Sequence, residues 1–287
     1  MGGNTVRRVG IVGSGIMGGG LAEVVAAGGM DVVVRSRTPE AGEALVAGVR
    51  KRLEKQVGKG QLSPEDRDAV LGRIRTTQHL SDLDDCDLVI ESVVEDLPVK
   101  LELFAELDSV VKPAAILATN TSTLPVTELA ARTGRADNVC GIHFFNPAPV
   151  MTLVEVVRPL TASDDTIATA VAFARACGKQ PVEVADRAGF VVNALLFPYL
   201  NNAVRLLEQG TASMEDIDTA MQGGCNFPMG PFALLDLVGL DTSVSILEAL
   251  HDESGDAFVV PAPTLRRMVA SGRLGRKSGR GFYDYTS

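Results

Sequence analysis

The chain has 287 residues, a length that suggests two domains or one large one. Apolar residues make up 46% of it and charged residues 22%, enough to build a packed core, so disorder is not expected. The formal net charge of −9 argues against general nucleic-acid binding. The sequence has no CxxC pair and only 3 histidines, so we predict no structural metal site.

The sequence shows no sign of a membrane or export segment. No run of 18 apolar residues occurs, and residues 1–12 lead into an apolar strand without a signal-peptide core. The 4 cysteines are widely spaced, as is typical of free thiols in a reducing compartment. We therefore expect a cytoplasmic protein with no membrane partner.

The first motif in the chain is a glycine-rich turn between a strand and a helix. Apolar residues 9–12 predict a buried strand, residues 21–27 predict a helix, and residues 31–35 predict a second strand. The turn has the pattern GxGxxG, in which glycines permit the bend, the approach of a pyrophosphate and close helix packing. Within a βαβ unit, this pattern predicts a dinucleotide site rather than an ordinary glycine turn. The predicted cofactor-binding residues here are Gly13, Gly15, Ile16, Met17 and Gly18.

The end of the second strand bears on the choice of cofactor. An acidic residue usually stands there and binds the adenosine ribose hydroxyls, but this chain has Ser36 followed by Arg37. A hydroxyl and a guanidinium suit a 2′-phosphate, which favours NADP(H) over NAD(H). The alternative is that Arg35 and Arg37 simply face solvent and the cofactor is NAD(H).

Two charge clusters follow. Basic residues gather at Arg50, Lys51, Arg52, Lys55 and Lys59, whereas residues 81–110 contain ten acids and one lysine. A solvated surface is the simplest interpretation of the acidic stretch. The basic cluster could instead contact a substrate that carries phosphate groups.

A single histidine stands at the end of a predicted strand. Further strands are predicted at 87–93, 115–119, 139–144 and 153–157, and their alternation with helices indicates a doubly wound parallel sheet. His143 lies where such strands open onto a ligand crevice, with Ser122 and Glu155 as candidate partners. A carboxylate bonded to one ring nitrogen would set the tautomer of the imidazole and make a general base of the other nitrogen. A lone histidine is more often an ordinary core or surface residue, so this interpretation depends on contacts that sequence does not show.

Long motifs throughout the chain, taken together, resemble the 3-hydroxyacyl-CoA dehydrogenase family in its short, single-function form. They are GSGIMGGG at 13–20, ATNTSTL at 118–124, GIHFFNPAPVMTLVEVV at 141–157, DRAGFVVNALLFPYLNNA at 186–203, FPMGPFALLDLVGLDT at 227–242 and GRKSGRGFYDY at 275–285. The resemblance implies a Rossmann-type α/β domain over 1–187 and a smaller, all-helical substrate and dimerisation domain over 188–287. It also implies a homodimer.

The resemblance also implies a reaction, hydride transfer between a nicotinamide cofactor and C3 of an (S)-3-hydroxyacyl thioester. His143 would be the general base, Glu155 would orient it, and Ser122 and Asn193 would bond substrate oxygens. Further family positions would lie near the nicotinamide ribose or on the CoA phosphates. These are Glu95, Lys100 and Asn146 for the cofactor, and Lys51, Lys55 and Lys59 for CoA.

Other functions remain open at this level. The acyl group could be carried by an acyl carrier protein, or the substrate could be a free hydroxy acid of the gulonate type. A non-catalytic protein related to lens crystallins is a fourth possibility, although His143, Glu155 and Asn193 are all present. An NADP(H) enzyme would tend to run reductively and an NAD enzyme oxidatively.

Overall fold

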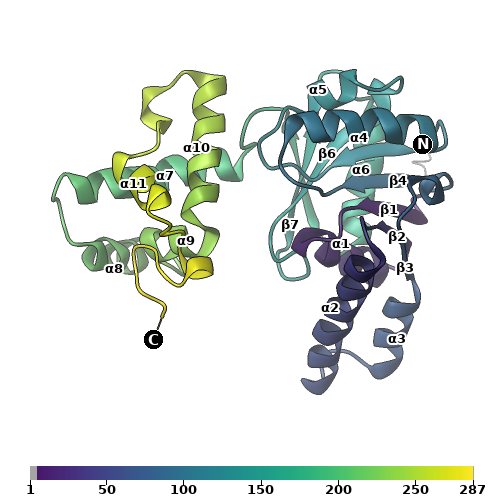
Figure 1. The fold of residues 1–287 in the computed structure, drawn as a ribbon, viewed down its shortest axis with the longest axis horizontal. Coiled ribbons are helices and arrows are strands. Elements are labelled where there is room, and N and C mark those ends of the chain that lie inside the picture. Colours follow the sequence, from purple (N-terminus) through teal and green to yellow (C-terminus); the bar gives the residue numbers. More distant parts are fainter. Residues whose placement is uncertain (1–4, 287) are drawn as a thin grey trace. The chain divides into compact units, whose positions relative to one another are not determined.

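The computed structural model describes residues 5–286, and the chain divides into two compact units, Met1–Asp186 and Arg187–Ser287 (Figure 1). The first unit contains every strand of the sheet, and the second is helical. This is the Rossmann-type architecture with a helical C-terminal part that the sequence predicts. Each unit is described by itself.

The first unit is built on an eight-stranded sheet of order β3-β2-β1-β4-β5-β6-β7-β8. The strands are β1 Arg8–Val12, β2 Asp31–Arg35, β3 Ile74–Thr77, β4 Leu88–Glu91, β5 Ile116–Thr119, β6 Val139–Phe144, β7 Leu153–Arg158 and β8 Gln180–Ala185. The chain order reverses between β1 and β4, and ligands bind outside the carboxyl ends of strands at such a switch point.

Helices cover both faces of this sheet. Helices α1 Ile16–Ala27, α2 Pro39–Gly58 and α6 Asp164–Ala176 share one apolar cluster with alternate strand residues. On β1, for example, Ile11 belongs to that cluster, yet its neighbour Val12 is equally inaccessible to solvent. The remaining helices of the unit are α3 Pro64–Gly72, α4 Leu97–Val110 and α5 Val126–Ala131, with 3₁₀ turns η1 Leu80–Leu83 and η2 Ala136–Asn138.

The sheet departs from the predicted parallel arrangement at one pair of strands. β6 and β7 run antiparallel, and every other pair is parallel. The segment between them, 145–152, is too short for the crossover of a dozen or more residues that parallel strands need. Two strands also lie outside the predicted ones, β3 and β8, because both are edge strands whose exposed residues weaken the apolar signal.

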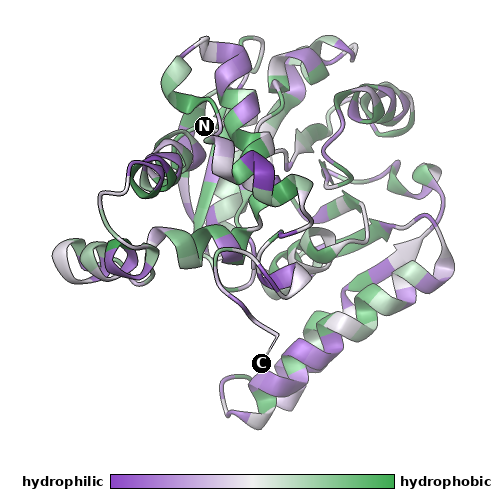
Figure 2. Ribbon diagram, turned by 60° about the vertical axis from the view of Figure 1, so that its left-hand side comes forward, coloured by the Kyte–Doolittle hydropathy of each residue, from purple (hydrophilic) through white to green (hydrophobic). Residues whose placement is uncertain are grey.

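The second unit is formed by α7 Val192–Glu208, α8 Met214–Cys225, α9 Pro231–Val238, α10 Leu240–Ser254 and α11 Pro263–Ala270. It also has 3₁₀ turns at η3 Ala257–Val259 and η4 Arg276–Ser278. Ser213 caps α8, since its side chain accepts from the N–H of Asp216. No helix in residues 5–286 combines the length and hydropathy needed to span a bilayer. Figure 2 shows apolar and polar residues mixed along the helices of both units.

The glycine-rich C-terminal motif packs on a buried acid. Asp236 is 1% exposed, and its carboxylate accepts from the N–H groups of Phe282 and Tyr283. A Cβ on Gly281 would lie 1.9 Å from an Asp236 oxygen, and one on Gly275 would lie 2.3 Å from the Asp236 carbonyl oxygen. Glycine is therefore required where this segment closes over α9.

Candidate functional site

The glycine turn after β1 has the shape of a pyrophosphate cradle. A Cβ on Gly13 would lie 2.3 Å from the carbonyl oxygen of Ser92, and one on Gly18 would lie 2.0 Å from that of Gly13. Gly15 differs, because a Cβ there would meet no heavy atom within 4 Å. Two glycines thus close the turn, and the third leaves open space beside the start of α1, where backbone N–H groups attract anions. These residues fit the phosphates of a dinucleotide.

The start of α1 presents an apolar side chain to solvent. Ile16 is 82% exposed, whereas Met17 is partly buried against the core. One turn later, a Cβ on Gly20 would lie 3.1 Å from Ala148 Cβ. The loop that follows β6 therefore packs directly on the dinucleotide helix.

The end of β2 places Ser36 and Arg37 side by side in the chain. Ser36 is 1% exposed, and its hydroxyl donates to the carbonyl oxygen of Thr38 at 2.8 Å. A serine hydroxyl rotates about its Cβ–Oγ bond, so the contact between Ser36 and a cofactor phosphate stays a prediction. Arg37 is exposed, and Arg35 donates through Nε to the carbonyl oxygen of Gln78 at 3.3 Å. Positive charge is therefore present at this edge of the sheet.

His143 and Glu155 face each other directly across the β6–β7 hairpin. The antiparallel register pairs these two residues, and His143 Nδ1 lies 2.8 Å from Glu155 Oε2. Their side chains are 5% and 1% exposed. A carboxylate in this position accepts the Nδ1 proton, which leaves Nε2 of the neutral ring as the basic nitrogen.

Ser122 brings a hydroxyl to the other nitrogen of the ring. It lies on the loop after β5, with Oγ 3.0 Å from His143 Nε2. The ring of Phe145 packs against the imidazole, with centroids 4.5 Å apart. The three residues that the sequence could only nominate, Ser122, His143 and Glu155, therefore form one constellation at the carboxyl edge of the sheet.

A buried group of charges lies at the same edge. The Lys100 ammonium is 2.7 Å from Glu91 Oε1 and 3.1 Å from Glu95 Oε2, and Lys100 and Glu91 are 1% and 0% exposed. Glu95 accepts from the Ser122 N–H at 2.9 Å and from the Thr121 hydroxyl. Burial alone would raise the pKa of Glu95, but the charge of Lys100 and these hydrogen bonds outweigh it and hold that pKa below its ordinary value.

The hydrogen bonds around Ser122 distinguish this constellation from a hydrolytic triad. Serine, histidine and glutamate in this order can form a nucleophile, but acyl transfer also needs free N–H donors for an oxyanion. Here the Ser122 N–H donates to Glu95, and the Thr123 and Leu124 N–H groups donate to Thr121 Oγ1. These donors are committed, which favours a proton-transfer role for His143.

The other predicted site residues are more scattered. Asn146 is exposed on the loop after β6, and Asn193 is buried in α7 of the second unit. A residue that the predictions omitted, Asn120, accepts from the Phe144 N–H at 2.8 Å and ties the loop after β5 to the strand that carries His143. Glu91 and Thr121 were also absent from the predicted site residues, because their local sequence does not show whether an acid or a hydroxyl is buried or exposed.

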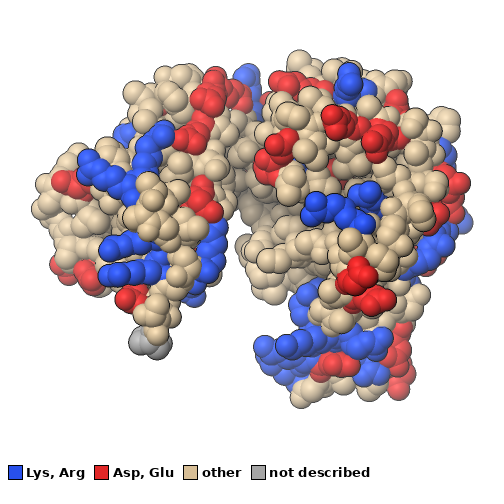
Figure 3. All heavy atoms as spheres, in the orientation of Figure 1, with Lys and Arg blue, Asp and Glu red and all other residues tan. Residues whose placement is uncertain are grey.

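The basic cluster lies on the exposed side of α2. Leu45, Val49 and Leu53 bury the other side of the helix, and Lys51, Lys55 and Lys59 lie at intervals of four residues in solvent. Figure 3 shows Lys and Arg gathered over this part of the first unit. Arg52 differs from the lysines, since its Nε lies 2.6 Å from the buried Glu23 of α1.

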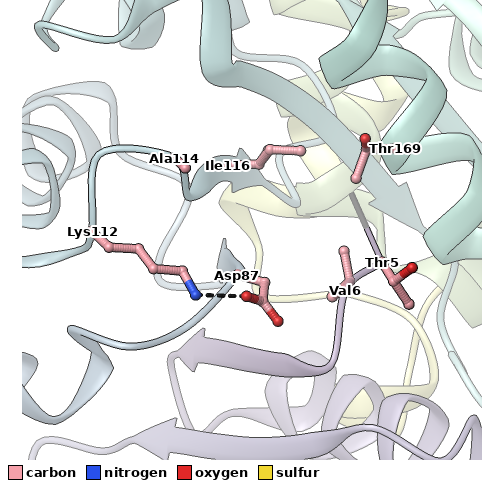
Figure 4. Close-up of a pocket in the computed structure, with 7 residues that line it drawn as sticks. All are labelled: Thr5, Val6, Asp87, Lys112, Ala114, Ile116 and Thr169. Atoms are coloured by element: carbon pink, nitrogen blue, oxygen red, sulfur yellow. Dashed lines mark hydrogen bonds and ion pairs between the residues drawn. The ribbon is translucent and has the colours of Figure 1, made fainter. Parts of the chain in front are cut away.

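A cavity of about 330 Å³ lies elsewhere in the first unit. Its lining includes Thr5, Asp87 and Lys112, which precede β1, β4 and β5 and so mark the amino edge of the sheet (Figure 4). His143 lies at the carboxyl end of its strand, so the cavity is separate from the site. Within residues 5–286, no group of three or more His, Cys, Asp or Glu side chains could hold a metal ion.

Comparison with known proteins identifies the family. The model for the 3-hydroxyacyl-CoA dehydrogenase NAD binding domain matches residues 8–187, and that for the C-terminal domain of the same family matches residues 189–285. The chain is 49% identical to a 3-hydroxybutyryl-CoA dehydrogenase of Mycobacterium tuberculosis, over 98% of this chain and 99% of that protein. It is 43% identical to the human mitochondrial hydroxyacyl-coenzyme A dehydrogenase, over 98% of this chain and 91% of that protein.

Solved structures agree with this assignment. The crystal structure of an (S)-3-hydroxybutyryl-CoA dehydrogenase from Ralstonia eutropha has a TM-score of 0.96 to this chain and 43% sequence identity, covering 99% of this chain and 100% of that one. The matching domains, the relatives and the site geometry lead to one conclusion: the chain belongs to the 3-hydroxyacyl-CoA dehydrogenase family.

Proposed function

We propose that the protein transfers a hydride between a nicotinamide cofactor and C3 of an (S)-3-hydroxyacyl-CoA, with 3-hydroxybutyryl-CoA as the model substrate. The observation that carries this proposal is the His143–Glu155 pair at the carboxyl edge of the sheet that also holds the glycine turn. Relatives named 3-hydroxybutyryl-CoA dehydrogenase support the choice of substrate.

His143 and Glu155 have different roles in the proposed proton transfer. During oxidation, His143 Nε2 takes the proton of the C3 hydroxyl, and the Glu155 carboxylate stabilises the imidazolium that results. The glycine turn after β1 would hold the cofactor, which would supply the hydride acceptor and the electronic part of the reaction. Ser122 and Asn193 would hold substrate oxygens, and burial of the His143 ring limits access of water.

Lys51, Lys55 and Lys59 are proposed to contact the CoA phosphates. Each is exposed, and an exposed ion pair contributes up to about 1 kcal/mol. Changing all three to Gln should therefore raise KM for a CoA thioester about tenfold. KM for the matching pantetheine thioester, which lacks the nucleotide phosphates, should not change. An equal rise in KM for both thioesters would mean that these lysines do not contact the CoA phosphates.

Arg37 is proposed to favour NADP(H) by contacting the 2′-phosphate. A hydrogen bond to a charged group contributes about 1.5–3 kcal/mol, so Arg37→Gln should lower the NADP(H) to NAD(H) ratio of kcat/KM about 10- to 100-fold. Arg132→Gln, at another exposed arginine of the same unit, serves as the control and should leave the ratio unchanged. A wild-type enzyme that strongly prefers NADH would contradict the proposed preference.

Substrate assays test the proposed function against its alternatives. Wild-type protein is offered (S)-3-hydroxybutyryl groups on CoA, on acyl carrier protein and as the free acid, with each cofactor. We expect the highest kcat/KM with CoA. Preference for the carrier-protein thioester would indicate a biosynthetic enzyme, activity on the free acid alone would indicate a gulonate-type dehydrogenase, and no activity on any of them would favour a non-catalytic role.

A homodimer formed through the second unit is also proposed. Five large apolar side chains of that unit are 42–71% exposed, and exposed apolar side chains of this size are common where subunits meet. They are Val191, Leu195, Phe227, Leu237 and Phe258. Sedimentation equilibrium of the purified protein should give twice the mass of one chain, and the mass of a single chain would contradict the proposal.

A further inference from the structure

We propose that Lys100 is a positioning residue, which acts through Glu95 and the Thr121–Ser122 turn to hold the Ser122 hydroxyl opposite His143. This inference rests on the proposed function, because it concerns how one member of that site is oriented. Lys100 would be needed for turnover even though its ammonium need not touch the reacting atoms.

The contacts form a continuous path from Lys100 to His143. The ammonium is bound to Glu91 at 2.7 Å and reaches Glu95 at 3.1 Å. Glu95 accepts from the Ser122 N–H at 2.9 Å and from the Thr121 hydroxyl, so it fixes both residues of the turn. From that turn, Ser122 Oγ reaches His143 Nε2 at 3.0 Å. Every step is a direct polar contact.

The place of Lys100 is unfavourable for an ordinary lysine. Residue 100 is in the first turn of α4, where the helix dipole disfavours a cation, and its side chain is 1% exposed. A buried ion pair is also weak evidence for stability, because desolvation of the two charges offsets most of their attraction. Glu91 compensates by accepting from the Val93 N–H at 2.6 Å and the Thr119 hydroxyl at 2.8 Å. Such an arrangement anchors the ammonium within 3.1 Å of the Glu95 carboxylate.

The anchored ammonium sets the charge state of Glu95. Lys100 helps to keep the pKa of Glu95 low, so that the carboxylate accepts two hydrogen bonds over the working pH range. The charged groups facing it are Lys100 from α4 and, behind that residue, Glu91 from β4. Without Lys100, its charge no longer lowers the pKa of Glu95, so that pKa should rise and the carboxylate should take up a proton at a higher pH than in wild type.

The central experiment compares Lys100→Met with Lys112→Met. Lys112 pairs with Asp87 at 2.6 Å at the amino edge of the sheet, so its loss removes an ion pair far from the turn. In Lys100→Met we expect kcat to fall about 10- to 100-fold, the effect of a misplaced catalytic group. KM for the CoA thioester should be nearly unchanged. Lys112→Met should keep wild-type kcat. Wild-type kcat in folded Lys100→Met, or equal losses in both variants, would overturn the proposal.

The pH profile separates positioning from a general loss of stability. The profile is measured in the direction of ketone reduction, because a falling pH does not remove the proton that His143 delivers in that direction. As the pH falls, kcat of Lys100→Met should begin to decline at a higher pH than kcat of wild type. A merely structural role predicts profiles of the same shape. Should Lys100→Met fail to fold, Glu91→Gln/Lys100→Met neutralises both buried charges and carries the same expectations.

A double-mutant cycle with Ser122→Ala tests whether Lys100 acts through Ser122. Adding Lys100→Met to Ser122→Ala should change kcat less than about threefold, since the hydroxyl that Lys100 positions is already gone. Independent, multiplying losses would contradict the proposal. If Ser122→Ala alone retains wild-type kcat, the role of Ser122 in the proposed function is what fails, and the two failures are therefore distinguishable.

Discussion

His143→Gln should lower kcat by a factor of about 10²–10⁴, the usual contribution of a general base, with cofactor affinity nearly unchanged. Glutamine can still donate to Glu155 across the hairpin, so the side-chain geometry is largely retained. The glutamine amide cannot take up a proton near neutral pH, however, so the C3 hydroxyl would lose its proton without a general base. Steady-state kcat with 3-hydroxybutyryl-CoA and the cofactor Kd by fluorescence titration measure the two effects separately.

The other histidines provide a matched control for this variant. His251 lies in the second unit, where Nδ1 is 3.1 Å from the carbonyl oxygen of Asp256, and His251→Gln should retain wild-type kcat. Equal activity in His143→Gln and wild type would remove His143 from the reaction. A loss of cofactor binding as large as the loss of kcat would instead indicate that the histidine shapes the cofactor site.

The second prediction concerns the glycine turn, where one variant should lower the free energy of unfolding and another should weaken cofactor binding. Gly18→Ala should destabilise the protein by about 1–3 kcal/mol, the range for overpacking, because its Cβ would lie 2.0 Å from the Gly13 carbonyl oxygen. The gain in helix propensity, about 1 kcal/mol, is too small to offset a clash with backbone. Gly15→Ala should leave stability unchanged, since a Cβ there meets nothing within 4 Å and φ is −72°.

Cofactor affinity completes this comparison. The Cβ of Gly15→Ala would stand in the space where the pyrophosphate approaches, so Kd for the dinucleotide should rise about tenfold or more. Urea denaturation and cofactor titration of both variants measure the two effects. Unchanged affinity in Gly15→Ala would mean that the phosphates do not lie over this residue, and a stable Gly18→Ala would mean that the turn can open.

Sequence was sufficient wherever the signal was local. The strand predicted at 9–12 and the helix predicted at 21–27 lie within β1 and α1, on either side of the predicted glycine turn, because the turn geometry depends on glycines a few residues apart. The helix itself begins earlier than predicted, at Ile16. The edge strands β3 and β8 were missed because edge strands lack the continuous apolar run that reveals a buried strand.

The site itself depended on the family resemblance and then on tertiary structure. The residues near 143 and 155 could be nominated, but only the antiparallel register of β6 and β7 brings those two side chains into contact. The same applies to Ser36, whose burial and hydrogen bond to the Thr38 carbonyl oxygen are set by the fold. The direction of a polar side chain depends on neighbours distant in the chain, so local composition does not reveal it.

The amino-acid sequence by itself therefore determined the dinucleotide turn, the class of fold and the catalytic candidates of this protein. Tertiary structure decided which of those candidates meet. It also added Glu91, which anchors the buried Lys100, and Thr121, which donates to Glu95 beside Ser122. The physical reason is that a turn is set by the conformational freedom of adjacent residues. A proton-transfer site is set instead by distances of about 3 Å between side chains brought together by strand register and burial.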